Sequence, residues 1–283
     1  MSSPGRHLTP VISPAIFAHR GFSAAHPEMT LAAYHAAIDW ARSSGITLGL
    51  ECDVHFSADD QLICLHDLDV DRTSDAAGPA FLRTVAQLKR IDFGARRNRA
   101  TTADERELVT LVELLDLIAD ARADGVDVRA VIETKHPNPR GLEVESRVAD
   151  LLRDRGWDGP DSPCRVITFS SPGLAKLVEL LPDVERTFLI DHTFLEWTDG
   201  TLPDGASVVG PNLELIRTDP AYVNSAQARG NQVHAWTINS PADVAFCLEL
   251  GITGLTTDVP DLVSSVLRQG QDGPSATATG QDA

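Results

Sequence analysis

Residues 48–67 read LGLECDVHFSADDQLICLHD, and this stretch decides how the chain folds. It contains two apolar runs, 48–56 and 62–65, which are separated only by the residues SADDQ. A connection between parallel strands needs a dozen or more residues, so the second run is expected to fold back on the first as a β-hairpin. It therefore adds no strand to a parallel sheet.

Short apolar or β-branched runs alternate with helix-like stretches along most of the chain, which is typical of βα units around a parallel sheet. Eight runs are expected to be parallel strands: 15–18, 48–56, 129–133, 165–169, 186–190, 207–209, 232–237 and 254–257. Six stretches are expected to be helices: 29–43, 111–123, 142–155, 172–181, 221–229 and 241–250. This order predicts an α/β fold, a single (β/α)8 TIM barrel with a β-hairpin after its second strand.

The expected barrel domain covers residues 14–268, and the composition changes on both sides of it. Residues 1–13 include two prolines and show no periodic pattern, while residues 269–283 contain no large apolar side chain. Both segments are expected to be disordered tails. Within the domain, the mostly polar residues 72–108 interrupt the alternation and are expected to form a small insertion over one barrel mouth.

The composition is that of a globular protein with an acidic surface. The 41 Asp and Glu residues outnumber the 24 Lys and Arg residues, and the formal charge of −17 argues against nucleic acid or anionic membranes as partners. The four cysteines show no CxxC spacing, and no apolar run approaches the roughly 18 to 20 residues that span a bilayer. We therefore expect a cytoplasmic protein with reduced thiols and no membrane insertion.

Carboxylates are concentrated on two of the expected strands. Side chains alternate along a strand, so Glu51 and Asp53 point to the same face of the second strand, and Glu133 ends the third. A solvated polar face would explain the first pair, but the middle of a parallel barrel strand is covered on both sides. Buried carboxylates repel one another unless a cation joins them, and an all-oxygen site suits Mg²⁺, Ca²⁺ or Mn²⁺.

Two histidines are expected near these carboxylates. His19 and Arg20 directly follow the first strand, at the barrel end where catalytic groups are found. The hairpin brings His66 back to a position roughly opposite Cys52, within about one residue of register. A histidine exchanges protons near neutral pH, and an arginine fork fits a phosphate. The alternatives are a hydrogen-bonded surface pair for His19 and Arg20, and an exposed hairpin end for His66.

Lys135 and Trp236 are further candidates for contact with a substrate. Lys135 shares a strand face with Glu133, so it is either a structural ion-pair partner or a group near the substrate. Trp236 lies on the same face as His234 near the end of the seventh parallel strand. It either fills the core or forms an apolar wall against the carbon chain of a substrate.

Taken together, these motifs resemble the glycerophosphodiester phosphodiesterase family over nearly the whole expected domain. The matching segments are Ala18–Gly21 with Pro27–Leu31, Glu51–Val54, His66–Thr73, Glu133–Lys135, Val233–Thr237 and Gly251–Asp258. One difference is visible in the first loop, because similar proteins usually have Asn at the position of Met29. Met29 is therefore expected to lack a polar contact that orients this loop.

The resemblance implies a TIM barrel with one divalent cation, Mg²⁺ or Ca²⁺, held by three carboxylates. It assigns the cation to Glu51, Asp53 and Glu133, the acid and base roles to His19 and His66, and phosphate contact to Arg20, with Lys135 near the substrate. The insertion after the second strand would be that of the family.

The implied reaction is hydrolysis of a small glycerophosphodiester to glycerol 3-phosphate and an alcohol. Similar enzymes are thought to use the glycerol hydroxyl of the substrate as nucleophile, although the same residues would serve direct attack by water. The alternatives are a lysophospholipase D-like activity on a lipid and a barrel that binds metal and ligand without turnover. The sequence does not indicate an oligomeric state.

Overall fold

The hairpin predicted from residues 48–67 is present in the computed structural model, which describes residues 13–193 and 196–271. Strand β2 (Leu48–Phe56) pairs antiparallel with β3 (Leu62–Cys64), with Val54 opposite Cys64. The Leu65 N–H donates to Asp53 O at 2.9 Å, which extends this register toward His66. The hairpin strand lies outside the parallel sheet, as the short connection requires.

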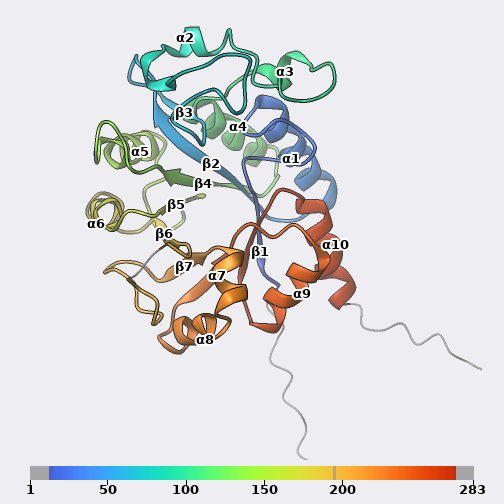
Figure 1. Cartoon of the computed structure of the whole chain (residues 1–283), viewed down its shortest axis with the longest axis vertical. Helices are drawn as coiled ribbons and strands as arrows, with labels where there is room; N and C mark the ends of the chain where they lie inside the picture. Colours follow the sequence, from blue (N-terminus) through green and yellow to red (C-terminus); the bar gives the residue numbers. More distant parts are fainter. Residues whose placement is uncertain (1–12, 194–195, 272–283) are drawn as a thin grey trace, which may run out of the picture.

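Eight parallel strands form a closed barrel in the spatial order β1, β2, β4, β5, β6, β7, β8, β9, and the barrel closes through the pairing of β1 with β9. This confirms the predicted fold class. Besides β2, the barrel strands are β1 (Ala15–Ala18), β4 (Val128–Thr134), β5 (Cys164–Thr168), β6 (Glu185–Ile190), β7 (Val208–Pro211), β8 (Gln232–Ala235) and β9 (Gly254–Thr257). Figure 1 shows these strands at the centre of the molecule.

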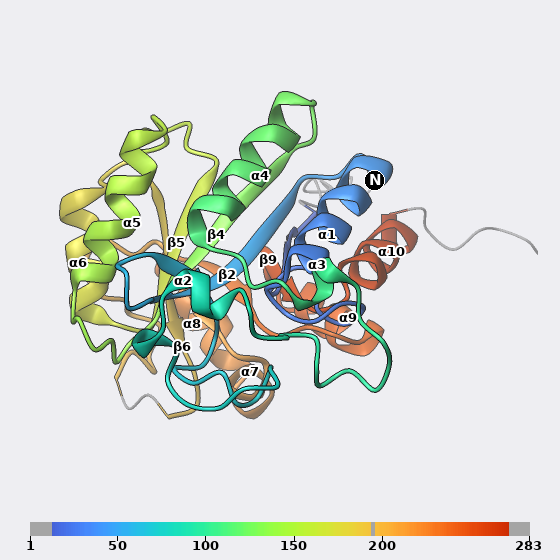
Figure 2. The ribbon, with the colours of Figure 1, turned by 90° about the horizontal axis from the view of Figure 1, so that it is seen from above.

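Helices surround the strands, as the view from above shows (Figure 2). The six predicted helices are α1 (Leu31–Ser44), α4 (Leu111–Ala123), α5 (Glu143–Asp154), α6 (Ser171–Leu180), α8 (Ala221–Ala228) and α9 (Pro241–Glu249), whose ends differ from the prediction by at most two residues. The largest shift is at α1, which begins after Thr30 because the Thr30 hydroxyl accepts a hydrogen bond from the Ala33 N–H and caps the helix.

Two helices outside the insertion were not predicted, α7 (Leu213–Thr218) and α10 (Pro260–Gln271). Helix α10 extends over residues 269–271, so the expected C-terminal tail is wrong for these three positions. Ser13 of the expected N-terminal tail is described and belongs to no helix or strand, and the remaining residues of the two expected tails, 1–12 and 272–283, lie outside the described part of the chain. Among the described residues, none of the helices is both long and apolar enough to cross a bilayer.

The segment 72–108 has its own short helices and its own small core. It contains η1 (Ala80–Leu82), α2 (Val85–Leu88) and α3 (Ala103–Arg106). Figure 1 shows α2 and α3 at the top of the molecule, and α3 contacts α1. Its buried apolar side chains pack with Ile63, Leu65 and Val70, which precede the insertion, in a cluster separate from the main core. The main core packs barrel strands against helices. A third cluster of Phe17, Val131, Ile167 and Leu189 joins four different barrel strands.

Candidate active site

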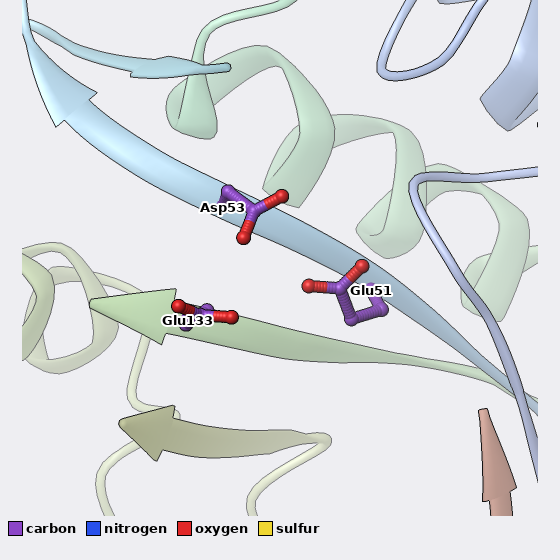
Figure 3. Close-up of side chains that lie close together, drawn as sticks. All are labelled: Glu51, Asp53 and Glu133. Atoms are coloured by element: carbon purple, nitrogen blue, oxygen red, sulfur yellow. The ribbon is translucent and has the colours of Figure 1, made fainter. Parts of the chain in front are cut away.

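Three carboxylates converge, two from the middle of β2 and one from the carboxyl end of β4 (Figure 3). Parallel pairing places Asp53 opposite Glu133, and Glu51 lies two residues earlier on the same face of β2. One oxygen atom from each carboxylate lies within 4.8 Å of one from each of the others, and all three residues are buried. Because every residue of β2 is buried, the alternative of a solvated polar strand face is excluded.

Two cations partly balance the cluster. Lys135 Nζ lies 2.8 Å from Glu133 Oε1 and 3.3 Å from Asp53 Oδ1, and Arg20 Nε lies 3.3 Å from Asp53 Oδ2. The Arg20 backbone N–H also donates to Glu51 Oε2 at 2.9 Å. The cluster therefore holds three carboxyl groups against two cationic side chains.

This imbalance is visible in the acidities of the three groups. Burial and the charge of Asp53 raise the pKa of Glu51 well above its ordinary value and that of Glu133 to about 8. Burial alone would raise the pKa of Asp53 too, but the charges of Lys135 and Arg20 hold it below its ordinary value. The three groups thus cannot all be ionised at neutral pH without further positive charge.

The cluster fits a divalent cation. Asp53 Oδ2 is buried and accepts no hydrogen bond from the described residues, and its ion pair with Arg20 Nε at 3.3 Å leaves it able to bind a cation. Oxygen ligands alone, with room for water or substrate oxygens, are the ligand set that Mg²⁺ and Ca²⁺ prefer. Glu51, Asp53 and Glu133 are therefore the residues that could hold such an ion.

His19 is placed by the closure of the barrel. It follows β1 directly, and Asp258 follows the neighbouring strand β9, with Ala18 opposite Thr257 in the ladder. The His19 Nδ1 hydrogen bonds to Asp258 Oδ1 at 2.7 Å, so Nε2 is the ring nitrogen left for a ligand. Burial opposes ionisation of Asp258, but its hydrogen bond with His19 and the charge of that ring lower the pKa to about 2.

His66 has an equivalent arrangement at the end of the hairpin. Its Nδ1 hydrogen bonds to Asp67 Oδ1 at 2.6 Å, and its backbone carbonyl accepts a hydrogen bond from His55 Nε2 at 3.1 Å. The side chain is 34% exposed, so it is neither a core residue nor a free hairpin end. Burial lowers the pKa of His66 from its ordinary value, although the charge of Asp53 opposes this shift.

A chain of ion pairs connects the His66 side of the mouth with Arg20. Arg72, the first residue of the insertion, donates to Asp67 at 2.5 Å and to both oxygens of Glu28 at 2.7 and 2.8 Å. Glu28 in turn accepts from Arg20 Nη1 at 2.9 Å. In this structure the Arg20 guanidinium is therefore held by carboxylates.

Met29 takes part in the backbone of the first loop instead of making a polar side-chain contact. It is buried with a φ of 54°, in the left-handed region that Asn tolerates better than Met, and its N–H donates to Arg20 O at 2.9 Å. Backbone hydrogen bonding and burial thus hold the loop at this position.

One cavity of about 720 Å³ connects the predicted residues. Seven of the eight site residues predicted from the sequence line it, namely His19, Arg20, Glu51, His66, Glu133, Lys135 and Trp236. The eighth, Asp53, belongs to the carboxylate cluster. The Trp236 ring meets Phe169 edge-on at 5.6 Å between centroids, while its Nε1–H donates to Gly210 O at 2.7 Å. Trp236 and Phe169 thus form an aromatic part of the cavity wall.

Sequence reasoning did not assign roles to Asp258, Asp67, Glu28 and Arg72. His19 and Asp258 are 239 residues apart, and only closure of a barrel with equal register makes them neighbours. The adjacency of Asp67 to His66 in the sequence was an available signal. Glu28 and Arg72 meet only through the folding of the insertion, for which spacing gives no signal.

The barrel and its mouth define a TIM-barrel enzyme, with carboxylates, histidines and cationic side chains together at the carboxyl ends of the strands. The chain belongs to the glycerophosphoryl diester phosphodiesterase family, a family of phosphoric diester hydrolases, whose model matches residues 19–262. This agrees with the resemblance seen in the sequence motifs.

Several known proteins are similar to this chain over nearly their whole length. A probable glycerophosphodiester phosphodiesterase 1 of Mycobacterium tuberculosis is 33% identical, with 91% of this chain and 94% of the relative covered. A glycerophosphodiester phosphodiesterase of Bacillus subtilis is 29% identical, with 93% and 87% covered. Among solved structures, an Oleispira antarctica phosphodiesterase in complex with the product sn-glycerol-3-phosphate has the same fold, with a TM-score of 0.75, 24% identity and 90% and 97% covered.

Proposed function

We propose that this enzyme hydrolyses small glycerophosphodiesters to glycerol 3-phosphate and an alcohol, and that the reaction depends on one divalent cation, Mg²⁺ or Ca²⁺. The observation that carries the proposal is the convergence of three buried carboxylates and two carboxylate-paired histidines on one cavity. The product bound to the Oleispira antarctica phosphodiesterase supports the choice of substrate class.

The two histidines are suited to move the protons of the reaction. Both have Nδ1 engaged by a carboxylate, which fixes the ring orientation and leaves Nε2 for the substrate. One histidine takes the proton of the attacking hydroxyl as a new phosphorus–oxygen bond forms. The other gives a proton to the alcohol oxygen as the old bond breaks, so the alcohol leaves neutral. If the attacking hydroxyl belongs to the glycerol moiety, the product is a cyclic phosphate, and water opens it in a second step in which the two histidines exchange roles. If the hydroxyl belongs to water, glycerol 3-phosphate forms directly.

Positive charge is needed beside the phosphoryl oxygens in the transition state. Arg20 and Lys135 line the cavity and provide part of it, and the substrate competes with the carboxylates that hold these side chains. A cation bound by Glu51, Asp53 and Glu133 would supply Lewis-acid stabilisation of the phosphoryl charge. Trp236 and Phe169 offer an apolar wall to the carbon chain.

The test measures the phosphorylated product that each diester releases, which is glycerol 3-phosphate from a small diester and lysophosphatidic acid from a lysolipid. The panel contains glycerophosphoglycerol, glycerophosphoethanolamine, glycerophosphocholine and a lysolipid, each measured with EDTA, Mg²⁺ and Ca²⁺. We expect turnover of the small diesters with a cation and none with EDTA. Preference for the lysolipid would favour the lysophospholipase D-like alternative, and absence of turnover with every cation would favour a non-catalytic binding barrel.

We also propose that the enzyme acts in the cytoplasm. All four cysteines are buried and free of disulfide bonds, which is compatible with a reducing compartment. Cell fractionation with an antibody against the chain tests this, and recovery in an extracellular or membrane fraction would contradict it.

A further inference from the structure

A second buried acid lies beside the cavity, apart from the carboxylate cluster. Glu145 belongs to the first turn of α5 and its side chain is fully buried. Its Oε1 lies 2.7 Å from Nε2 of His136, a residue that follows Lys135 after strand β4 and lines the cavity. The other oxygen, Oε2, has no hydrogen-bond partner among the described residues, so the contact with His136 is what compensates the burial of this acid.

Gly173 leaves the space in which this pair meets. It lies in the first turn of α6, and a Cβ atom there would lie 2.7 Å from Glu145 Oε1 and 3.2 Å from His136 Nε2. Alanine is otherwise the better residue in a helix, by about 1 kcal/mol. The glycine at this position thus leaves the space that the hydrogen bond between His136 and Glu145 occupies.

The pair leaves one atom of His136 for a ligand. Because Nε2 is engaged by Glu145, the ring nitrogen free to meet a molecule in the cavity is Nδ1. In the neutral ring Nδ1 accepts a hydrogen bond, and in the protonated ring it donates one. A hydroxyl group satisfies either state since it both donates and accepts, whereas a quaternary ammonium group satisfies neither.

We propose that His136 is a further substrate-binding residue, which hydrogen bonds a hydroxyl group of the substrate through Nδ1, and that Glu145 and Gly173 position it. The inference rests on the proposed function, whose substrates carry hydroxyls on the glycerol moiety and, in some diesters, on the leaving alcohol. Either hydroxyl has the required chemistry, and the choice of substrate in the test distinguishes them.

The first variant is His136→Gln. The glutamine amide reaches the position of Nε2 and preserves the hydrogen bond to Glu145, while nothing replaces Nδ1. Loss of one hydrogen bond to a hydroxyl should raise KM about 3- to 10-fold with kcat within about twofold of wild type. The melting temperature should stay unchanged, which separates binding from folding.

The second variant is Gly173→Ala, which displaces the Glu145 carboxylate without altering either partner. We expect a similar rise in KM, and no further rise when it is combined with His136→Gln, because both changes remove the same contact. The matched control is Gly270→Ala in α10, where an added Cβ has nothing within 4 Å. A role that is only structural would lower the melting temperature of Gly173→Ala and leave KM unchanged.

The substrates are glycerophosphoglycerol, with hydroxyls at both ends, and glycerophosphocholine, with hydroxyls only on the glycerol moiety. An equal rise in KM for both places the contact on the glycerol moiety, and a rise for glycerophosphoglycerol alone places it on the leaving alcohol. An unchanged KM for both in His136→Gln overturns the proposal.

The proposed function can fail separately. If the wild-type protein turns over neither diester, calorimetric binding of intact glycerophosphoglycerol to wild type and His136→Gln still tests the inference. Weaker binding to the variant supports it, and equal Kd values overturn it.

Discussion

The carboxylate cluster and the His136–Glu145 pair are both buried acidic sites at the same barrel mouth, but they differ in charge balance. The cluster joins three carboxyl groups with two cationic side chains, Arg20 and Lys135. At the other site one carboxylate meets one imidazole at 2.7 Å. The cluster is thus short of positive charge, while Glu145 has its partner within the protein.

Because of this difference in charge balance, the two kinds of buried acid are expected to affect the stability of the protein in opposite ways. A carboxyl group in the cluster is repelled by its neighbours. Its removal should therefore stabilise the metal-free protein, although the same removal destroys the proposed cation site. Removal of the partnered Glu145 leaves an unpaired group in the interior and should destabilise the protein. Two substitutions of the same residue type are therefore expected to change the melting temperature in opposite directions.

The largest expected effect is that of Glu51→Gln on activity. The amide keeps the size of the side chain and can accept the hydrogen bond from the Arg20 N–H, but it loses the charge that binds a cation. We expect turnover to fall by about a thousandfold or more, which corresponds to about 4 kcal/mol of barrier. In EDTA the melting temperature should rise by a few degrees, since about 1 kcal/mol of relieved repulsion shifts it by about 2 to 4 °C.

The matched control is Glu179→Gln, an exposed acid on α6 that pairs with Lys176 at the surface. It should change neither activity nor melting temperature. A metal-free Glu51→Gln protein that melts below wild type would contradict the charge imbalance in the cluster.

The next largest effect is expected from His19 and His66. Each of these histidines belongs to the proposed catalytic machinery, like the cluster, but is paired with its own carboxylate, like His136. His19→Ala and His66→Ala should each lower kcat by about 10² to 10⁴-fold, equal to about 3 to 5 kcal/mol of barrier. If they act on one proton transfer sequence, the double variant loses much less than the product of the single effects. The measurement is a double-mutant cycle on kcat, with calorimetric melting alongside.

His35→Ala is the control, since His35 is half-exposed on α1, outside the cavity, and lies 3.6 Å from Asp104. It should retain full activity. Near-normal kcat in either catalytic variant, or activity lost only through unfolding, removes that histidine from the proposed mechanism.

Glu145→Ala tests the contribution of the His136–Glu145 pair to stability. Breaking a buried pair on one side costs about 3 kcal/mol or more, so the melting temperature should fall by about 5 to 10 °C. The control is Glu143→Ala, since Glu143 lies two residues earlier on α5 and pairs with Arg140 at the surface. Its melting temperature should fall by much less. Equal melting of the two variants would mean that His136 does not stabilise the buried acid.

Sequence reasoning found the cluster but not the pair, and the difference has a physical cause. Glu51 and Asp53 are two residues apart on one strand, and Glu133 ends the next parallel strand, so alternation and strand order bring them together. Glu145 meets His136 only through the packing of α5 against the cavity wall, and the gap at Gly173 that admits them is on a third element. No periodic pattern encodes such a contact.

The same distinction holds for the fold. The eight strands and the hairpin follow from apolar runs and from the length of their connections. Helix α10 was missed because polar residues dominate its second half, and its apolar residues pack on the barrel only as one face. The partners of Arg72 depend on the path of the insertion, which its polar sequence does not determine.

The smallest expected effect is a pH dependence of stability that originates in the cluster. The pKa of Glu133 is 4.5 in its ordinary state and is raised by burial and by Asp53 to about 8 in the folded protein. A group with a raised pKa contributes its full stability below the unfolded value, and this contribution is lost as pH rises through the folded value. The metal-free protein should therefore lose stability between about pH 4.5 and 8 on account of Glu133.

Other groups titrate in this window, so the wild-type profile alone cannot isolate Glu133. Burial lowers the pKa of His66 and His234, and such groups add stability as pH rises toward their ordinary values, which is the opposite slope. These contributions cancel in the difference between wild type and Glu133→Gln. Measured in EDTA, the melting temperature of the variant should rise relative to that of wild type as the pH increases from 5 to 8. A difference that stays constant over this range would mean that Glu133 is ionised in the folded metal-free protein, and that Lys135 alone is enough to balance it.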